Sequence, residues 1–302
     1  MERIGFIGLG NMGGPMSANQ AKGQRKVRAF DLSPDALARA EAAGCEPAAS
    51  IAGAVADADA VITMLPAGPQ VRQVVTRQVI PNARPGTLIV DCSTIDVETA
   101  REMSELCHAA GLRYADAPVS GGMVGAEAAT LTFMVGCRDD ETFAAVEDAV
   151  RPMGRAAIRA GGPGAGSAAK ICNNMLLGIS MIGACEAFAL AERLGLDAQR
   201  FFEIAAKSSG QCWSVTTNCP VPGPVPASPA NHGYEPGFAA AMILKDLKLA
   251  QACAASAGAS TPMGAQAEGL YALFDRLGYG HKDFSAIIQL IRGDLAELER
   301  AS

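Results

Sequence analysis

The sequence lacks the marks of several large protein classes. Its nine cysteines are odd in number, irregularly spaced and without a C-x-x-C pair, which predicts reduced thiols rather than a disulfide framework or a metal site. Cys172 and Cys185 lie in an apolar stretch, which is typical of small buried side chains. No basic, Arg-rich or Ser-rich leader precedes the apolar residues 4–7. We therefore expect a cytoplasmic protein with no metal.

Positive charge and long apolar runs are also scarce. The chain has 25 Lys and Arg against 31 Asp and Glu, a net charge of -6, and the basic residues are scattered. A nucleic-acid partner would need a clustered basic face. The longest central stretch without charge, 171–185, is interrupted by Asn173, Asn174 and Ser180, and no apolar run reaches the ~18–20 residues that cross a bilayer. We expect neither nucleic-acid binding nor membrane insertion.

What the sequence does contain is a folded, two-part pattern. Its 302 residues, 49% hydrophobic, are enough for about two domains of ~150 residues. The first half alternates short apolar runs, which predict strands, with stretches of helical period. The expected strands are 4–7, 27–30, 60–65, 88–91, 113–116 and 131–135, and the expected helices are 13–21, 34–43, 69–79 and 97–110. This alternation predicts right-handed crossovers and a mostly parallel sheet covered on both faces.

The pattern changes after Gly166. Residues 167–194 contain no proline, keep a helical period and end near Gly195. Beyond them only helices are expected, at 197–207, 239–257, 262–277 and 282–300, with an irregular proline-rich loop over 219–236. The sequence thus predicts one domain over 1–163, a long interdomain helix over 164–195, and an all-α domain over 196–302.

A glycine motif follows the first expected strand. Residues 8–13 read G-L-G-N-M-G, a G-x-G-x-x-G pattern that opens a helix inside a β-α-β unit. Gly8 allows a tight turn, Gly10 lets a pyrophosphate approach, and Gly13 lets helix and strand pack closely. The alternative is an ordinary glycine turn. In this context the motif predicts a dinucleotide site and a Rossmann-type doubly wound α/β sheet.

The cofactor is expected to be NAD. The second strand ends in Asp31, 23 residues after Gly8, where a carboxylate would bind the adenosine ribose hydroxyls and repel a 2′-phosphate. Leu32 and Ser33 follow, so no arginine there would receive that phosphate, although Arg28 lies on the preceding strand. The alternative for Asp31 is a helix cap before the helix at 34–43.

A lysine on the long helix has the spacing of a second site. Lys170 precedes Asn173 and Asn174 by three and four residues, so these side chains share a helix face. The glycine-rich residues 161–166 would bring the backbone close to whatever the helix start faces. At an expected domain cleft this lysine is a possible acid/base. On spacing alone, a surface lysine is the competing interpretation.

Two further segments point to an anionic ligand. D-A-P-V-S-G-G at 116–122 follows the fifth expected strand, and Ser120 with the amides of Gly121 and Gly122 could hold a carboxylate or hydroxyl. Lys245 and Asp246 offer a cation and a carboxylate on a later helix. The alternatives are a plain glycine turn and a solvated helix face.

Taken together, four segments resemble the β-hydroxyacid dehydrogenase family. They are G-L-G-N-M-G-G-P-M at 8–16, the motif at 116–122, G-x-G-x-x-x-K at 164–170 with its asparagines, and K-D-L at 245–247. They occur in the family's order over nearly the whole chain. Residues 170–177, 208–213 and the proline-rich loop that ends in Gly237 and Phe238 look most like the 3-hydroxyisobutyrate dehydrogenase branch.

That resemblance implies NAD-dependent oxidation of 3-hydroxyisobutyrate to methylmalonate semialdehyde, a step of valine catabolism, by a homodimer or homotetramer. It implies that Lys170 is the catalytic acid/base, oriented by Asn174 and Asn173, and that Ser120, Gly121 and Gly122 hold the substrate carboxylate. It places Trp213, Phe238 and Asp246 near the substrate, and it implies that the all-α domain over 196–302 serves substrate binding and dimerisation. The implied cofactor contacts are Gly8, Leu9, Gly10, Asn11, Met12, Gly13, Asp31, Leu65, Pro66, Gln70, Thr94 and Lys245.

Two other functions stay open at this point. One is a related reductase of tartronate, succinic or glyoxylic semialdehyde, although such enzymes often prefer NADP, which Asp31 disfavours. The other is a non-catalytic NAD-binding scaffold, which the presence of Lys170, Asn174 and Ser120 disfavours.

Overall fold

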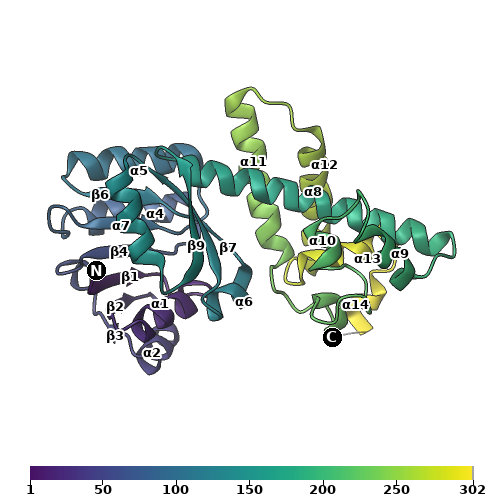
Figure 1. The fold of residues 1–302 in the computed structure, drawn as a ribbon, viewed down its shortest axis with the longest axis horizontal. Coiled ribbons are helices and arrows are strands. Elements are labelled where there is room, and N and C mark those ends of the chain that lie inside the picture. Colours follow the sequence, from purple (N-terminus) through teal and green to yellow (C-terminus); the bar gives the residue numbers. More distant parts are fainter. Residues whose placement is uncertain (301–302) are drawn as a thin grey trace. The chain divides into compact units, whose positions relative to one another are not determined.

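A computed structural model describes residues 1–300 and divides the chain into two compact units (Figure 1). Unit 1 is Met1–Lys170, and unit 2 begins at Ile171. The division falls inside one continuous helix, α8 (Ala165–Arg193), whereas the domain boundary predicted from the sequence lies a few residues earlier, at 163/164. Each unit is described by itself below.

Unit 1 contains a nine-stranded sheet in the order β3-β2-β1-β4-β5-β6-β8-β7, with β9 paired to β8. The pairs from β3 to β6 are parallel, and β8 runs antiparallel to β6 and β7. The strands are β1 Arg3–Ile7, β2 Lys26–Phe30, β3 Glu46–Pro47, β4 Ala60–Thr63, β5 Leu88–Asp91, β6 Arg113–Asp116, β7 Val119–Ser120, β8 Leu131–Cys137 and β9 Gly154–Gly161. The predicted Rossmann-type, mostly parallel sheet is confirmed.

Helices cover both faces of this sheet (Figure 1). They are α1 Gly13–Lys22, α2 Pro34–Ala42, α3 Ile51–Val55, α4 Gly68–Val74 with a π-helical turn Val75–Val79, α5 Val97–Ala109, α6 Gly122–Glu127 and α7 Asp140–Val150. Alternate strand residues enter different cores: Phe6 and Ile62 lie in one buried cluster, and Ile7, Val61 and Ile89 in the other. Burial on both faces explains why the strands read as unbroken apolar runs.

The described residues of unit 2, 171–300, form helices and loops without a named strand, as predicted. Its elements are the body of α8, then α9 Ala198–Ala205, α10 Trp213–Thr216, α11 Ala240–Ala257, α12 Pro262–Phe274, α13 Ile287–Arg292 and α14 Ala296–Arg300. The expected single helix over 282–300 is wrong. Asp283 caps a 3-10 turn, Phe284–Ala286, and Gly293 takes a left-handed φ of 78° between α13 and α14. Residues 219–236 form the expected irregular loop around one 3-10 turn, Pro229–Asn231.

Helix α8 also corrects the expectation about membrane-length segments. Its most apolar 18-residue window has a mean hydropathy of 1.6, so its length and composition alone would suffice to cross a bilayer. The interruptions by Asn173, Asn174 and Ser180 are too few to lower this average below that of a spanning helix. Core helices of soluble proteins meet the same criterion, and Met181, Cys185 and Phe188 of α8 are buried in the core of unit 2.

Candidate active site

The glycine motif forms a turn between β1 and α1. Each of its three positions is suited to glycine for a different physical reason. Gly8 has a φ of 94°, a left-handed conformation that favours glycine. A Cβ on Gly13 would overlap the carbonyl oxygen of Gly8, so its absence lets α1 begin against the end of β1. Around Gly10 a Cβ would meet nothing within 4 Å. Packing within the chain therefore explains Gly8 and Gly13 but leaves the space at Gly10 for a ligand.

The start of α1 fits a phosphate. Met12 stands at the N-cap position without a side-chain cap hydrogen bond, and the first turn of α1 contains no acidic residue. Asn11 is exposed, while Leu9 packs in the core and holds the turn in place. Uncapped amides at the positive end of a helix dipole bind phosphate groups. Residues 8–13 therefore fit the pyrophosphate of a dinucleotide.

Asp31 fixes this turn from the end of β2. Its Oδ2 accepts a hydrogen bond from the Leu9 amide at 2.6 Å, and its Oδ1 accepts one from the Ser33 amide at 2.8 Å. Asp31 does not cap α2, because the Ser33 hydroxyl does so by accepting from the Ala36 amide. Since a carboxylate has about four lone-pair sites, half-buried Asp31 retains acceptor capacity for ribose hydroxyls.

The arginine whose direction the sequence left open points elsewhere. The guanidinium of Arg28 lies 3.4 Å from Glu46 and 3.7 Å from Asp57, so two carboxylates already surround it. Leu32, next to Asp31, is 91% exposed. The end of β2 thus presents a carboxylate and an apolar side chain, which suits an adenosine without a 2′-phosphate.

The ends of β4 and β5 are tied together by a buried polar cluster. The Ser93 hydroxyl accepts from the Leu65 amide at 2.8 Å, which fixes the loop of Leu65 and Pro66 beside that of Thr94. Asp91, fully buried, organises this cluster: its Oδ1 accepts from the Thr63 hydroxyl at 2.7 Å and from the Ser93 amide at 3.1 Å. The side chains of Ser93 and Asp91 therefore fix the positions of the two predicted cofactor loops relative to each other.

Burial makes this cluster electrostatically unusual. Loss of hydration raises the pKa of Asp91 to about 6, against the opposing effect of hydrogen bonds from Ser93 and Thr63. The Tyr114 hydroxyl lies 3.4 Å from Asp91 Oδ2, and burial raises the pKa of Tyr114 well above its usual range. Asp116, which pairs with Asp91 across β5 and β6, also has a raised pKa because it is buried.

The predicted carboxylate cradle follows β6. Ser120 ends the short strand β7, and Gly121 and Gly122 have φ values of 136° and 61°, which favour glycine. Ser120 is half-buried and Gly121 exposed, so a ligand can reach them. This turn lies between β7 and α6, where Ser120 pairs with Thr132 near the start of β8.

Lys170 lies in α8 as the last residue of unit 1, and it is only 9% exposed. It follows Ser167 by three residues, less than one helical turn. Asp116 binds the start of this helix: its Oδ1 accepts from the Gly164 amide and its Oδ2 from the Ser167 amide, both at 2.8 Å. A surface lysine is therefore not what the structure shows.

In unit 2, α8 and α11 bring four predicted residues together. The amide of buried Asn174 donates to Asp246 Oδ2 at 2.5 Å, and its carbonyl oxygen accepts from the Asn173 amide at 3.0 Å. The Lys245 ammonium lies 3.3 Å from Asp246 Oδ1. Asp246 thus has a definite role as the acceptor that orients Asn174.

Three predicted residues have other surroundings. Gln70 is exposed in the first turn of α4, and Trp213 on α10 is 50% exposed. The Phe238 ring packs edge-to-face on Phe284 with centroids 5.7 Å apart, and its amide donates to buried Asp283 at 3.0 Å.

Known proteins match this chain along most of its length. Residues 3–162 match the NAD-binding domain of 6-phosphogluconate dehydrogenase, and residues 164–291 match the domain described as NAD-binding of NADP-dependent 3-hydroxyisobutyrate dehydrogenase. The 3-hydroxyisobutyrate dehydrogenase of Pseudomonas aeruginosa is 44% identical, covering 97% of this chain and 99% of its own. The chain belongs to the β-hydroxyacid dehydrogenase family. Within that family it is most like the 3-hydroxyisobutyrate dehydrogenases.

Two further relatives bear on the substrate. A solved structure of the Mycobacterium tuberculosis 3-hydroxyisobutyrate dehydrogenase with L-serine has a TM-score of 0.93 and 49% identity, and it covers 97% of this chain and 99% of its own. The NAD-dependent L-serine dehydrogenase of P. aeruginosa is 43% identical, over 96% of this chain and 98% of its own. This β-hydroxyacid dehydrogenase is an oxidoreductase that acts on a CH–OH group with a nicotinamide cofactor.

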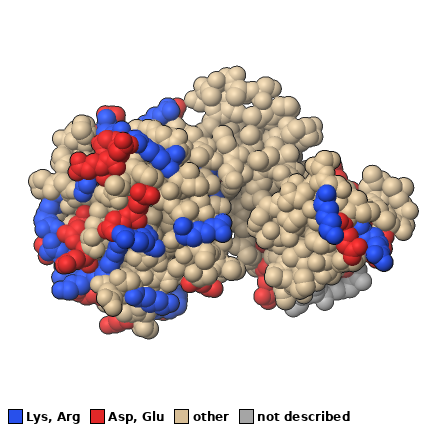
Figure 2. Space-filling view, in the orientation of Figure 1, with Lys and Arg blue, Asp and Glu red and all other residues tan. Residues whose placement is uncertain are grey.

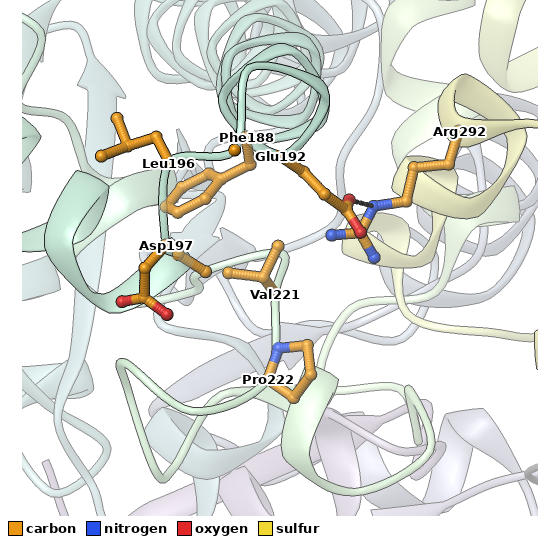
Figure 3. Close-up of a pocket in the computed structure, with 9 residues that line it drawn as sticks. Phe188, Glu192, Leu196, Asp197, Val221, Pro222 and Arg292 are labelled. Atoms are coloured by element: carbon orange, nitrogen blue, oxygen red, sulfur yellow. Dashed lines mark ion pairs between the residues drawn. The ribbon is translucent and has the colours of Figure 1, made fainter.

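A separate pocket in unit 2 of this family member has no part in the site. It is lined by Phe188, Glu192, Leu196, Asp197, Val221, Pro222 and Arg292, with Gly195 and Ala198 (Figure 3). The Arg292 guanidinium is paired with Glu192 at 3.0 Å. None of the residues predicted for substrate or cofactor lines it.

On the face shown in Figure 2, basic and acidic side chains are interspersed over unit 1 rather than separated by sign.

The sequence did not single out the buried carboxylates of this dehydrogenase. Asp91 and Asp116 are the last residues of β5 and β6; Asp91 accepts from the Thr63 hydroxyl on neighbouring β4, and Asp116 accepts from the Gly164 amide at the start of α8. The signal available was an acidic residue at the last position of an apolar strand. Acidic side chains are rarely fully buried unless they have partners, so such positions deserve a functional interpretation.

Proposed function

We propose that this protein catalyses NAD-dependent oxidation of 3-hydroxyisobutyrate to methylmalonate semialdehyde, in valine breakdown and in the cytoplasm. The observation that carries this proposal is the setting of Lys170. It is nearly buried in a helix whose start is hydrogen-bonded to Asp116, the same segment that leads into the Ser120 turn. The near full-length similarity to named 3-hydroxyisobutyrate dehydrogenases supports it.

In the proposed reaction, Lys170 takes the proton of the substrate hydroxyl as the carbinol carbon loses a hydride and becomes the aldehyde carbonyl. The nicotinamide, when bound, accepts that hydride. The Ser120 hydroxyl and the amides of Gly121 and Gly122 bind the substrate carboxylate. Lys170 must be neutral at the start, so oxidation should rise with pH as it loses its proton.

Asn174 would orient the reacting groups. Its amide nitrogen is held by Asp246 and its carbonyl oxygen by Asn173, so the side chain cannot rotate freely. On the same helix, Lys170 and Asn174 are four residues apart, the spacing at which side chains are neighbours.

The preference for NAD rests on the end of β2. Asp31 has spare acceptor capacity for ribose hydroxyls, and its charge repels a 2′-phosphate. Arg28, the nearby cation on β2, is paired with Glu46 and Asp57. NADP-linked semialdehyde reduction is thus the weaker alternative.

Oxidation of L-serine is a second candidate. It is favoured by the relative named as an L-serine dehydrogenase and by the solved relative with L-serine. Serine and 3-hydroxyisobutyrate share a carboxylate and a primary hydroxyl on the β-carbon, so the same lysine and cradle would serve both. They differ at the α-carbon, in an amino group against a methyl group.

The experiment is a kinetic comparison of NADH formation from 3-hydroxyisobutyrate, L-serine, threonine and glycerate, with reduction of the three semialdehydes in parallel. We expect the highest kcat/KM for 3-hydroxyisobutyrate with NAD. A higher value for L-serine would make the second candidate correct, and faster NADPH-linked reduction would favour the reductase.

The role of Lys170 has its own test. We expect Lys170→Ala to lower kcat by about 10²–10⁴-fold, the usual contribution of acid–base catalysis, while NAD binding persists. Exposed Lys22→Ala on α1 is the matched control. Turnover of Lys170→Ala near the wild-type rate would refute the assignment.

We also propose a homodimer or homotetramer, supported by exposed Leu176 and Leu190 on α8 and measurable by light scattering.

A further inference from the structure

We propose that Asp116 is a positioning residue that fixes the start of α8, and with it Lys170, relative to the Ser120 turn. This inference rests on the proposed function, because it assigns Asp116 a role through the lysine. It goes beyond that function by explaining how two segments 50 residues apart are held in one geometry.

The contacts are specific to a carboxylate. Asp116 is 1% exposed, and its two oxygens accept from the two backbone amides of Gly164 and Ser167 at 2.8 Å each. An ionised carboxylate accepts at both oxygens, whereas an asparagine accepts at one and presents N–H groups at the other. Negative charge at this end of a helix is also favoured by the helix dipole.

Backbone packing prevents the helix start from sliding. A Cβ on Gly136 of β8 would lie 2.5 Å from Asp116 Oδ1 and 2.7 Å from the Gly166 amide nitrogen. A Cβ on Gly166 would overlap the carbonyl oxygen of Met134 and lie 2.6 Å from that of Asp116. The first turn of α8 therefore rests directly on the backbone of β6 and β8. Gly166 serves this contact, whereas Gly164, with a φ of 82°, faces Val97 and Arg101 of α5.

Asp116 is linked to both halves of the proposed chemistry. Through the chain it precedes Ser120 by four residues, across the short connection from β6 to β7. Through hydrogen bonds it holds Ser167, and Lys170 follows by three residues, about 4.5 Å along the helix axis. A shift of the helix start would move the lysine relative to the carboxylate cradle, and a misplacement of ~1 Å can cost about 10²-fold in rate.

The charged and titratable groups around Asp116 leave this capping role intact. Burial raises the pKa of Asp116, while the amides of Ser167 and Gly164 act in the opposite direction. Asp91 pairs with Asp116 across the strands, and Tyr114 and Cys137 feel its charge. The two amides therefore offset part of the cost of burying this carboxylate.

The test compares Asp116→Asn with Asp139→Asn in the full-length enzyme. Asp139 caps α7 of the same unit by accepting from the Thr142 amide at 2.7 Å, and it is the matched control for loss of a helix-capping carboxylate. We expect Asp116→Asn to lower kcat by about 10²-fold, with the KM of the acid and the Kd of NAD within about threefold of wild type. Asp139→Asn should keep its kcat.

Hydrogen–deuterium exchange provides a readout that does not depend on turnover. In Asp116→Asn, exchange of the peptide 165–176 should accelerate while that of α7 does not. Should this variant fail to fold, Asp116→Glu keeps both acceptors on a side chain one methylene longer, and we expect its kcat to fall about tenfold. Unchanged kcat in the variant tested, or unchanged exchange at 165–176, would overturn the inference.

The two proposals fail in different ways. If wild-type enzyme oxidises none of the hydroxy acids, the proposed function is wrong, and the exchange data alone decide whether Asp116 holds the start of α8. If wild type is active and Asp116→Asn is equally active, only the positioning role is wrong.

Discussion

The buried carboxylate of Asp91 should make the stability of unit 1 depend on pH in an unusual direction. Asp91 is 0% exposed, and burial raises its pKa from 3.8 to about 6. Between these two values the folded protein holds a proton that the unfolded chain releases. Stability is therefore greatest below about pH 4 for this group and is lost as pH rises through about 6.

The magnitude follows from the shift. A difference of about 2 units in pKa, at about 1.4 kcal/mol per unit, gives a total of about 3 kcal/mol. About 2 kcal/mol of this stability is lost between pH 4 and pH 7. Asp91→Asn does not titrate and has the shape of the protonated acid. Relative to wild type, the variant should therefore become more stable by about 2 kcal/mol from pH 4 to pH 7.

The assay is urea unfolding at several pH values, followed by far-ultraviolet circular dichroism. Trp213, the single tryptophan, lies in unit 2, so its fluorescence separates the unfolding of that unit. Asp59→Asn is the control, because the pKa of Asp59 is shifted in the opposite direction, downward. Against the raising effect of partial burial, the Arg3 and Glu2 amides and the Arg3 guanidinium lower the pKa of Asp59 to about 2. Its difference from wild type should stay flat from pH 5 to pH 7. A flat difference for Asp91→Asn as well would refute the reasoning.

Other substitutions separate folding from ligand binding. Gly10→Ala should leave the melting temperature unchanged and weaken NAD about tenfold or more by calorimetry, whereas Gly13→Ala, which meets the Gly8 carbonyl, should destabilise by about 1–3 kcal/mol. Asp31→Ala removes the acceptor of the Leu9 amide and should raise the Kd of NAD and narrow its preference over NADP, measured by titration with both. Asp246→Ala leaves the Asn174 amide buried without its acceptor and should lower kcat about 10-fold or more in steady-state assays, with NAD affinity kept.

Much of the fold could be predicted because it depends on local periodicity. The six strands expected from apolar runs all form, since burial on both faces leaves a plain hydrophobic signal. The strands that were not expected lack that signal. β3 and β7 have two residues each, and β9 carries Arg155 and Arg159 with little burial. Their pairing is decided by neighbours in space, which the sequence does not display.

The site divides in the same way. The open backbone at Gly10 could be predicted because a spacing rule links this glycine to a strand and a helix, and the structure shows free space where its Cβ would stand. Its contact with a cofactor stays a prediction. The pairing of Asn174 with Asp246 joins residues 72 positions apart, and no spacing rule reaches that far. The break in the helix expected over 282–300 could not be predicted either. Asp283 accepts hydrogen bonds from Asn218, Gly237 and Ser285, which lie in three separate segments of the chain.

Because Lys170, Asn173 and Asn174 lie on one continuous helix, α8, the directions of their side chains around the helix axis are fixed relative to one another. One unbroken run of backbone hydrogen bonds carries Lys170, Asn173 and Asn174, with its first turn anchored by Asp116. At 3.6 residues per turn, one inserted residue between 171 and 172 would turn every later side chain by about 100° relative to the anchor. An insertion of seven would nearly restore the direction. The protein can therefore tolerate changes of length in its loops far more readily than in this helix, whose residue count sets the facing of its polar side chains.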